Sequence, residues 1–393
     1  MHFELRNSGN QKPLNPQKFG FEIKDNIPPH LSSLFVYQSD PGKQVMSLPL
    51  EYKLKKQNGT YGLASPQVLK LERNTGFGVE VNDYLDDSSN PCGIYTLELS
   101  VDNHVIYLFR LDEFGFEESR YVNAHADYRM EVLYDRQIHL LYRKPNNKLL
   151  MYPVMINNGI FNFQSGLKYP VNIKITDATG NESKLDFEVE GSSLSILSDS
   201  SGMDEKTIFS CKSTNYFENS FLRLEVPKGA IYENMSFDYA RTFSGSVLYP
   251  YIHFVGSTSV PLHFSSVLSI HADMVPDTYR NKTLIIRLID NEGPSSEGGT
   301  WNGDWLSTRI LNFGKYTIDL DTIPPQITAL NITKEANLTE QQYIRFKVTD
   351  NLSGISEYNG IIDNKWVLFE YDLKDDLVFY KFDKTRLKSG IKH

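Results

Sequence analysis

Two tryptophans in a glycine-rich stretch are the residues of this sequence best suited to binding a ligand. Trp301 and Trp305 lie in the segment Gly298-Gly299-Thr300-Trp301-Asn302-Gly303-Asp304-Trp305, and its glycines favour an exposed loop. Flat indole faces can stack on sugar rings, and the neighbouring Asn and Asp can hydrogen-bond to them. The alternative is that one tryptophan closes the end of a hydrophobic core. Trp301 and Trp305 are therefore possible glycan-binding residues, with a core role left open.

Several histidines are eligible metal ligands, but their spacing does not form a close two-residue ligand signature. For His125, Asp127 and His139 we expect hydrogen-bonded structural roles. The wide and uneven spacing of a second group favours packed or solvent-facing histidines over a zinc site; this group is His253, His263 and His271.

A carboxylate-rich segment could hold calcium through Asp83, Asp86, Asp87 and Asn90. The segment lacks the glycine and the terminal glutamate of an EF-hand loop, so a polar turn is the better interpretation.

The first residues alternate in the manner of a half-buried strand. Phe3 and Leu5 alternate with charged residues, and Pro13 and Pro16 then forbid a helix and stop any ladder. Because a strand needs partners, we expect this one to be the last strand of a sheet whose other strands precede the chain.

This stretch, Met1-His2-Phe3-Glu4-Leu5-Arg6 followed by Pro13-Leu14-Asn15-Pro16, resembles the end of the catalytic domain in lysostaphin-type zinc metallopeptidases, which cut peptide cross-links in bacterial cell walls. That family closes its site with His-x-His-Phe-Glu-hydrophobic-Arg, and the second histidine is a zinc ligand while the first assists the bound water. The resemblance assigns the zinc ligand to His2, which would act only when the upstream domain is present. The other ligands and the first histidine would precede Met1, so the resemblance implies no catalytic residue in this chain.

The remaining chain resembles the long C-terminal extension of such peptidases in Bacteroidetes-type bacteria, with Arg120-Tyr121-Val122-Asn123 and Val226-Pro227-Lys228-Gly229-Ala230 as landmarks. The resemblance implies a non-catalytic accessory region that positions or targets a peptidase acting on peptidoglycan, and a chain that is inactive alone. Zinc would belong to the full-length parent only, and no cofactor is expected for this chain alone. We expect a location in the periplasm or cell envelope, with the export signal upstream.

The partners implied are peptidoglycan or another envelope glycan, and possibly envelope proteins. The alternative function is a stand-alone module that binds envelope glycan or protein, for adhesion or scaffolding, with no link to proteolysis.

Composition limits the function further. Acidic residues outnumber basic ones by 49 to 40, which argues against nucleic acid because phosphate-binding proteins concentrate positive charge. No stretch reaches the roughly 20 apolar residues of a membrane helix. Gly-x-Ser-x-Gly, His-Glu-x-x-His and phosphate-loop motifs are absent, although a pair of carboxylates for glycoside cleavage stays open because such pairs converge in space. Cys92 and Cys211 fall in different candidate domains and are too few for a disulfide framework.

A repeated junction divides the chain. Asp25-Asn26-Ile27-Pro28-Pro29 returns as Asp321-Thr322-Ile323-Pro324-Pro325, and paired prolines suit a stiff linker that leads into an edge strand. With 23 Tyr and 23 Phe, we expect a mainly β protein of tandem immunoglobulin-like β-sandwich domains. The predicted units are a terminal strand and linker of a truncated peptidase domain (1–24), a sandwich with an insertion (25–191), a linker (192–204), a second sandwich (205–320) and a third immunoglobulin-like domain (321–393).

Within these units the clearest predicted strands alternate over Tyr95 to Val101 and Val105 to Leu111, which read as a hairpin. A short helix is expected between Glu117 and Tyr128. In the third domain we count three clear strands, one of them Lys365 to Asp372, and therefore expect the domain to be truncated and to lack its closing hairpin.

Overall fold

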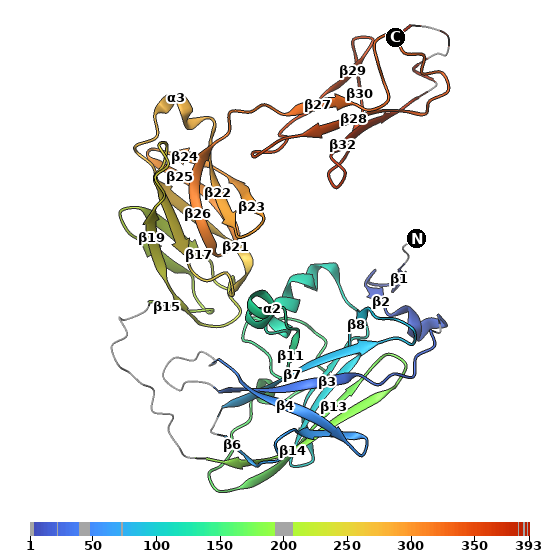
Figure 1. Cartoon of the computed structure of the whole chain (residues 1–393), viewed down its shortest axis with the longest axis vertical. Helices are drawn as coiled ribbons and strands as arrows, with labels where there is room; N and C mark the ends of the chain where they lie inside the picture. The colour runs from blue at the N-terminus through green and yellow to red at the C-terminus, as the bar shows by residue number, and fades with distance from the viewer. Residues whose placement is uncertain are drawn as a thin grey trace.

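The computed structural model describes residues 4–21, 23–38, 48–71, 74–192, 207–383, 385–387, 390 and 392–393. Figure 1 shows three β units that follow one another along the chain, coloured from blue and green through yellow to red. The prediction of a mainly β chain built from tandem immunoglobulin-like sandwiches is confirmed.

A small hairpin precedes the first unit. Strand β1 (Leu5–Arg6) pairs with β2 (Pro13–Leu14), and a 3-10 helix (Pro16–Phe19) follows, with Asn15 as its N-cap. The strand thus finds a partner a few residues downstream. The prediction that the prolines stop the ladder is wrong for Pro13, which joins β2 while its carbonyl accepts from the N–H of Phe114 at 3.1 Å. Lys12 also pairs with Glu118 at 2.7 Å, which fastens the hairpin to the first unit.

The first unit is a sandwich in which ten strands form one hydrogen-bonded path, in the order β11-β7-β3-β4-β5-β14-β13-β9-β10-β12, while β6 pairs with β14 and β8 pairs with β7 beside it. Strand β4 connects the two layers, since its first half pairs with β3 and its second half with β5. The bounds are β3 (His30–Gln38), β4 (Leu50–Gln57), β5 (Thr60–Leu63), β6 (Leu69–Leu71), β7 (Thr75–Tyr84), β8 (Pro91–Cys92), β9 (Thr96–Val101), β10 (His104–Arg110), β11 (Ile138–Leu140), β12 (Val154–Met155), β13 (Lys168–Thr176) and β14 (Glu182–Gly191).

Strand β3 is buried on both faces because it separates two apolar clusters. Leu34 and Val36 point into the sandwich core. Phe35 and Tyr37 point the other way, into a smaller cluster that includes Ile138 of β11. The segment between β10 and β12 therefore packs as a second layer over one sheet.

The predicted hairpin is confirmed as β9 and β10, where Asp102 and Asn103 both take positive φ (51° and 61°), the backbone of a tight two-residue turn. The predicted helix is broken into pieces: η2 (Phe116–Tyr121), α1 (Val122–His125) and α2 (Tyr128–Tyr134). The break occurs because Asp127 caps α2, its Oδ1 accepting from the N–H groups of Arg129 and Met130. A further short 3-10 helix is η3 (Asn157–Gly159).

The second unit packs two five-stranded sheets, β16-β17-β21-β25-β24 and β19-β20-β26-β22-β23, around one core. Its elements are β15 (Thr207–Phe209), β16 (Asn215–Glu218), β17 (Leu222–Val226), β18 (Met235–Phe237), β19 (Tyr239–Phe243), β20 (Tyr251–Val255), β21 (Pro261–His271), α3 (Asp277–Arg280), β22 (Thr283–Ile289), β23 (Gly293–Gly298), β24 (Thr300–Asn302), β25 (Trp305–Asn312) and β26 (Gly314–Leu320). The predicted exposed loop around the tryptophans is wrong, because both lie on strands.

The third unit contains a four-stranded sheet, β27-β28-β32-β31, and the hairpin β29-β30. The count of three strands is too low because the additional strands are short and lie mostly at the surface, so they show no alternation of buried and exposed residues. In addition, the single strand expected over Lys365 to Asp372 divides in two. The bounds are β27 (Gln326–Ala329), β28 (Tyr343–Thr349), β29 (Gly360–Ile362), β30 (Lys365–Val367), β31 (Glu370–Asp372) and β32 (Leu377–Lys381).

Candidate functional site

The two tryptophans occupy opposite faces of the hairpin β24–β25. Trp301 lies directly opposite Leu306, and Asn302 lies opposite Trp305. Leu306 is fully buried in the core of the second unit. Because cross-strand partners share a face and successive residues alternate, Trp301 faces the core and Trp305 faces outward. The two indoles therefore do not form one stacking platform.

Trp301 closes one end of the second core. Its Nε1–H donates to the carbonyl of Arg280 at 2.8 Å, and the Arg280 guanidinium lies 4.5 Å from the ring centroid. Arg280 also donates to the carbonyl of Gly303 and to Asp304, both at 2.8 Å, which fixes the turn of the hairpin. The core role left open for one of the tryptophans is thus the role that Trp301 occupies.

Trp305 lies on the outer face among polar side chains. The Arg223 guanidinium stands 4.0 Å from the Trp305 ring centroid, and the His271 ring lies 4.9 Å away. Arg223 is held in turn by Glu218 at 2.8 Å. One face of this indole is therefore covered by a cation, and the half-buried ring lies outside the core of the second unit.

A third tryptophan is more exposed than either of these. Trp366 on β30 keeps 59 % of its surface exposed and lies opposite Ile361, which is 65 % exposed. The sequence analysis passed over this residue.

The histidines of the first unit have structural partners. His125 Nε2 lies 3.3 Å from His139 Nδ1, and His125 Nδ1 lies 3.2 Å from the Tyr152 hydroxyl. Burial, with His139 nearby, lowers the pKa of His125 to about 3, and burial lowers the pKa of His139 to about 4. Both rings are therefore neutral at pH 7. Asp127 points elsewhere and accepts from the Tyr37 hydroxyl at 2.7 Å.

The histidines of the second unit lie apart from one another. His253 is fully buried between two tyrosine hydroxyls, Tyr239 at 2.9 Å from Nδ1 and Tyr249 at 2.7 Å from Nε2. Burial first, and Arg241 second, lower the pKa of His253 to about 4. His263 stacks on Tyr121 of the first unit at 4.1 Å.

The predicted calcium segment is rearranged. Asp83 is buried, whereas Asp86 turns to the incoming chain and accepts from the backbone and side-chain N–H groups of Asn26. Asp83 instead meets Asp25 and Asp177, and these three form the only group of three or more metal-ligating side chains within the described residues. The sequence analysis had noticed Asp25 in the junction, but nothing in the spacing linked Asp25 or Asp83 to Asp177.

A joint between the first two units is centred on Arg120, which belongs to one of the two landmark segments. Arg120 donates from Nε to the Leu262 carbonyl at 2.8 Å and from Nη2 to the Leu311 carbonyl at 3.2 Å. The Tyr232 hydroxyl donates back to the Arg120 carbonyl at 2.6 Å. Asn146 Nδ2 donates to the carbonyls of Cys211 and Ile231 at 2.8 and 2.7 Å. These contacts use backbone carbonyls of the second unit as fixed acceptors.

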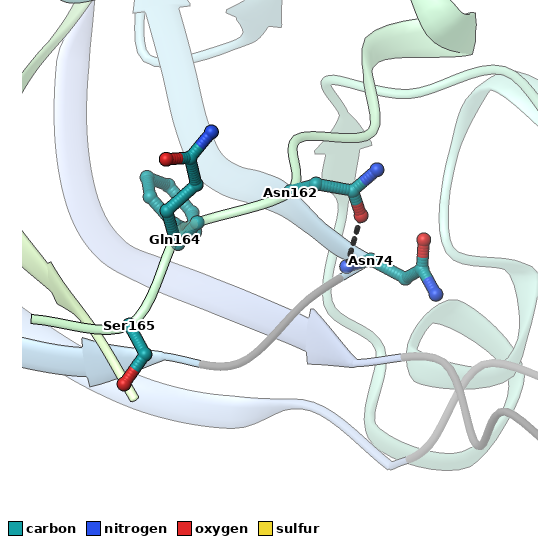
Figure 2. A pocket seen from close by; sticks show the side chains of 5 residues that line it. Asn74, Asn162, Gln164 and Ser165 are labelled. Carbon is teal, nitrogen blue, oxygen red and sulfur yellow. Dashed lines mark hydrogen bonds between the residues drawn. The ribbon is translucent and has the colours of Figure 1, made fainter. Parts of the chain in front are cut away.

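Two hollows accompany this architecture. A cavity of about 220 Å³ lies at the joint, where Lys144 and Glu233 pair at 2.8 Å. A polar depression of about 560 Å³ on the first unit is lined by Asn74, Asn162, Phe163, Gln164 and Ser165. In Figure 2 the Asn162 side chain turns toward Asn74, and its Oδ1 accepts a hydrogen bond from the backbone N–H of Asn74 at 2.8 Å. None of these five lining side chains titrates, so the depression offers hydrogen bonds rather than acid or base chemistry.

His2 and the two cysteines are the remaining residues that the sequence analysis singled out. His2 lies outside the described residues, so its assignment as a zinc ligand stays a prediction. Both cysteines are free, Cys92 exposed and Cys211 buried. Among the described residues, no helix combines the length and apolar character needed to cross a membrane.

Comparison with known proteins gives a partial match. The model of the Zu5-like domain matches residues 206–321, which are the strands of the second unit. No curated protein matches the chain. Among solved structures, the central fibronectin-III array of RIM-binding protein is 7 % identical and covers 85 % of this chain and 97 % of its own, with a TM-score of 0.14. A similarity this low carries no argument. What the chain resembles locally is thus a Zu5-like β domain in its second unit.

Proposed function

We propose that this chain is a non-catalytic accessory region of a cell-envelope zinc metallopeptidase that acts on peptidoglycan cross-links, and that its β units hold the catalytic domain in position. The observation that supports this most is the joint centred on Arg120. A positioning module must transmit a fixed distance and orientation, and a joint of charge-assisted hydrogen bonds to backbone carbonyls keeps two sandwiches in one relative placement. Arg120, from one of the landmark segments, thus has a mechanical role in this proposal.

The arrangement of titratable groups also favours a non-catalytic role. The buried histidines are neutral and hydrogen-bonded to tyrosines or to each other. Catalytic zinc usually requires three protein ligands and an open position for water. In the described residues the one candidate metal group consists of oxygen ligands only, which suits a hard cation rather than a catalytic zinc.

The test joins a lysostaphin-type catalytic domain to the N-terminus of this chain and measures peptide release from intact cell-wall sacculi and from soluble muropeptides. We expect the chain to raise release from sacculi several-fold and to leave release from soluble muropeptides unchanged. Arg120→Ala should remove the gain, whereas Arg110→Ala should keep it. Arg110 is a suitable control because its exposed pair with Asp112 (2.6 Å) lies within the first unit. Equal release with and without the chain would refute the proposal.

A second candidate function, glycan binding, is favoured by the outward position of Trp305. An indole on the outer face of a sheet, with polar neighbours, can present its exposed part to a sugar ring. Sedimentation with purified sacculi tests this: Trp305→Ala should weaken binding, and Arg309→Ala, a neighbouring exposed change on the same strand, should not. Unchanged sedimentation of Trp305→Ala would retire this candidate.

A further inference from the structure

Three carboxylates from distant segments converge at one end of the first sandwich. Asp25 belongs to the proline-rich junction, Asp83 lies near the end of β7, and Asp177 begins the turn between β13 and β14. One carboxylate oxygen from each lies within 4.8 Å of the other two. Two oxygens that ligate the same calcium ion, each at about 2.3 to 2.6 Å, are separated by at most about 5 Å, so this spacing suits a shared ion.

Asp83 supplies an independent sign that a ligand belongs here. Its side chain is 3 % exposed, and its Oδ1 is buried without a hydrogen-bond partner. A buried acceptor left unpaired is costly, and a buried carboxylate beside two others is costlier still. Lys24, which precedes the junction, does not relieve the charge, because it pairs with Asp86 at 3.6 Å.

The other two carboxylates are held in place by hydrogen bonds from their own turns. Asp177 Oδ1 accepts from the backbone N–H groups of Thr179, Gly180 and Asn181 and from the Thr179 hydroxyl, and its Oδ2 accepts from Asn181 Nδ2. Asp25 Oδ1 accepts from the N–H of Ile27 at 3.0 Å. These turns fix the carboxylates before any ligand arrives, which reduces the ordering cost of binding.

The junction repeat reproduces half of this arrangement in the third unit. Asp321 Oδ1 accepts from the N–H of Ile323 at 3.1 Å, as Asp25 does from Ile27. Asp350 directly follows β28 and has a buried Oδ2 without a partner. The two aspartates also occupy corresponding positions in their sheets. Asp83 directly follows Asn82, which pairs with His30 at the start of the strand after the first junction. Asp350 directly follows Thr349, which pairs with Gln326 at the start of the strand after the second junction.

The third unit has no described counterpart of Asp177 in a metal-ligating group with these two residues. It therefore supplies a natural comparison, with the same junction and strand positions and one carboxylate fewer.

We propose that Asp25, Asp83 and Asp177 bind one calcium ion that ties the proline-rich junction to the first sandwich. The ligand set contains only hard oxygen donors, which calcium prefers. Water and backbone carbonyls complete the six to eight oxygen ligands that calcium typically takes, about three of which are these carboxylates. Without a cation, burial and the charges of Asp177 and Asp25 raise the pKa of Asp83 to about 7, so the ion replaces a proton that would otherwise relieve the repulsion.

The test titrates calcium chloride into the full chain, freed of metal by a chelator, and follows the heat by calorimetry and the melting temperature. We expect saturable binding of one ion and a rise in the melting temperature on the order of 5 to 10 °C at a hundredfold excess over the dissociation constant. Asp83→Asn should weaken calcium binding at least tenfold without unfolding the chain, because the amide is isosteric with the protonated carboxyl. Magnesium chloride should bind more weakly than calcium.

Asp350→Asn is the matched control, since it changes the corresponding position of the incomplete site and should leave both heat and melting shift unchanged. Asp25→Asn gives a second variant outside the buried core, with the same expected loss. Absence of saturable heat in the wild-type chain at millimolar calcium would overturn the proposal. Calcium binding that survives in both Asp83→Asn and Asp25→Asn would overturn it as well.

Discussion

Acid should destabilise the second unit through His253. The folded pKa of this buried ring is about 4, against an ordinary value of 6.5. The unfolded chain therefore binds the proton first, so stability is lost as the pH falls from about 6.5 to about 4 and is fully present above this window. At pH 5 the histidine is almost wholly protonated in the unfolded chain and almost wholly neutral in the folded one. At about 1.4 kcal/mol per pH unit, the free energy of unfolding is therefore about 2 kcal/mol lower at pH 5 than above pH 6.5.

The experiment compares urea unfolding of the wild-type chain and His253→Gln at pH 8 and pH 5. Tryptophan fluorescence suits the purpose because the chain has three tryptophans, two of which lie in the hairpin β24–β25 of the second unit. Gln can still donate and accept, so the variant should fold, although it will be less stable at pH 8 because its geometry between Tyr239 and Tyr249 is poorer.

The wild-type chain should lose about 2 kcal/mol more between pH 8 and pH 5 than the variant does. His104→Gln, an exposed change in the first unit, is the control. It should lose as much unfolding free energy between pH 8 and pH 5 as the wild-type chain does. If His253→Gln loses as much stability as the wild type over the same interval, the buried neutral histidine is not the cause and the reasoning fails.

Three further outcomes follow from the fold. Trp301→Ala should lower the melting temperature of the second unit by several degrees, since removing a core aromatic costs about 3 to 5 kcal/mol, whereas Trp305→Ala should change it little; a reversed order in calorimetry would contradict the assigned faces. Cys92 should react with a thiol reagent in the native state and Cys211 only on unfolding, because Cys211 is buried and burial raises its pKa; equal native rates would be inconsistent with this. The third unit should exchange amide hydrogens faster than the first, because its strands are short and β27 is wholly exposed; mass spectrometry showing equal protection would argue against it.

The strands that the sequence predicts well are those that alternate over five or more residues against a single core. The segments Thr96–Val101 and Leu222–Val226 are of this kind, and each alternates between buried and partly or fully exposed residues in the structure. The strands that sequence reasoning missed are short, as with Gly360–Ile362, or buried on both faces, as with His30–Gln38, where no alternation remains to be read.

The candidate sites show the same limit more sharply. The segment of Trp301 and Trp305 was singled out from its composition, but as an exposed loop rather than a hairpin, and the assignment of faces depends on register, which the sequence does not display. The Asp25, Asp83 and Asp177 group could not be found from spacing, because the fold brings it together from three distant segments: the junction, the end of β7 and the turn after β13. The junction repeat was visible, yet its physical meaning required the register of the strands that follow it.

The parallel pairing of β14 has a mechanical consequence for a chain that is pulled. Strand β14 pairs in parallel with β5 and β6 and antiparallel with β13, and it is the last strand before the chain leaves the first unit. Tension along the chain would load β14 in shear against these neighbours, so its hydrogen bonds would have to break together rather than one after another. The bonds from Gly191 N–H to the Leu167 carbonyl (2.9 Å) and from Ser192 N–H to the Leu71 carbonyl (2.8 Å) secure the exit point where that force would enter. The first sandwich should therefore resist extension far better than the third, whose strands are shorter and would peel apart under a small force.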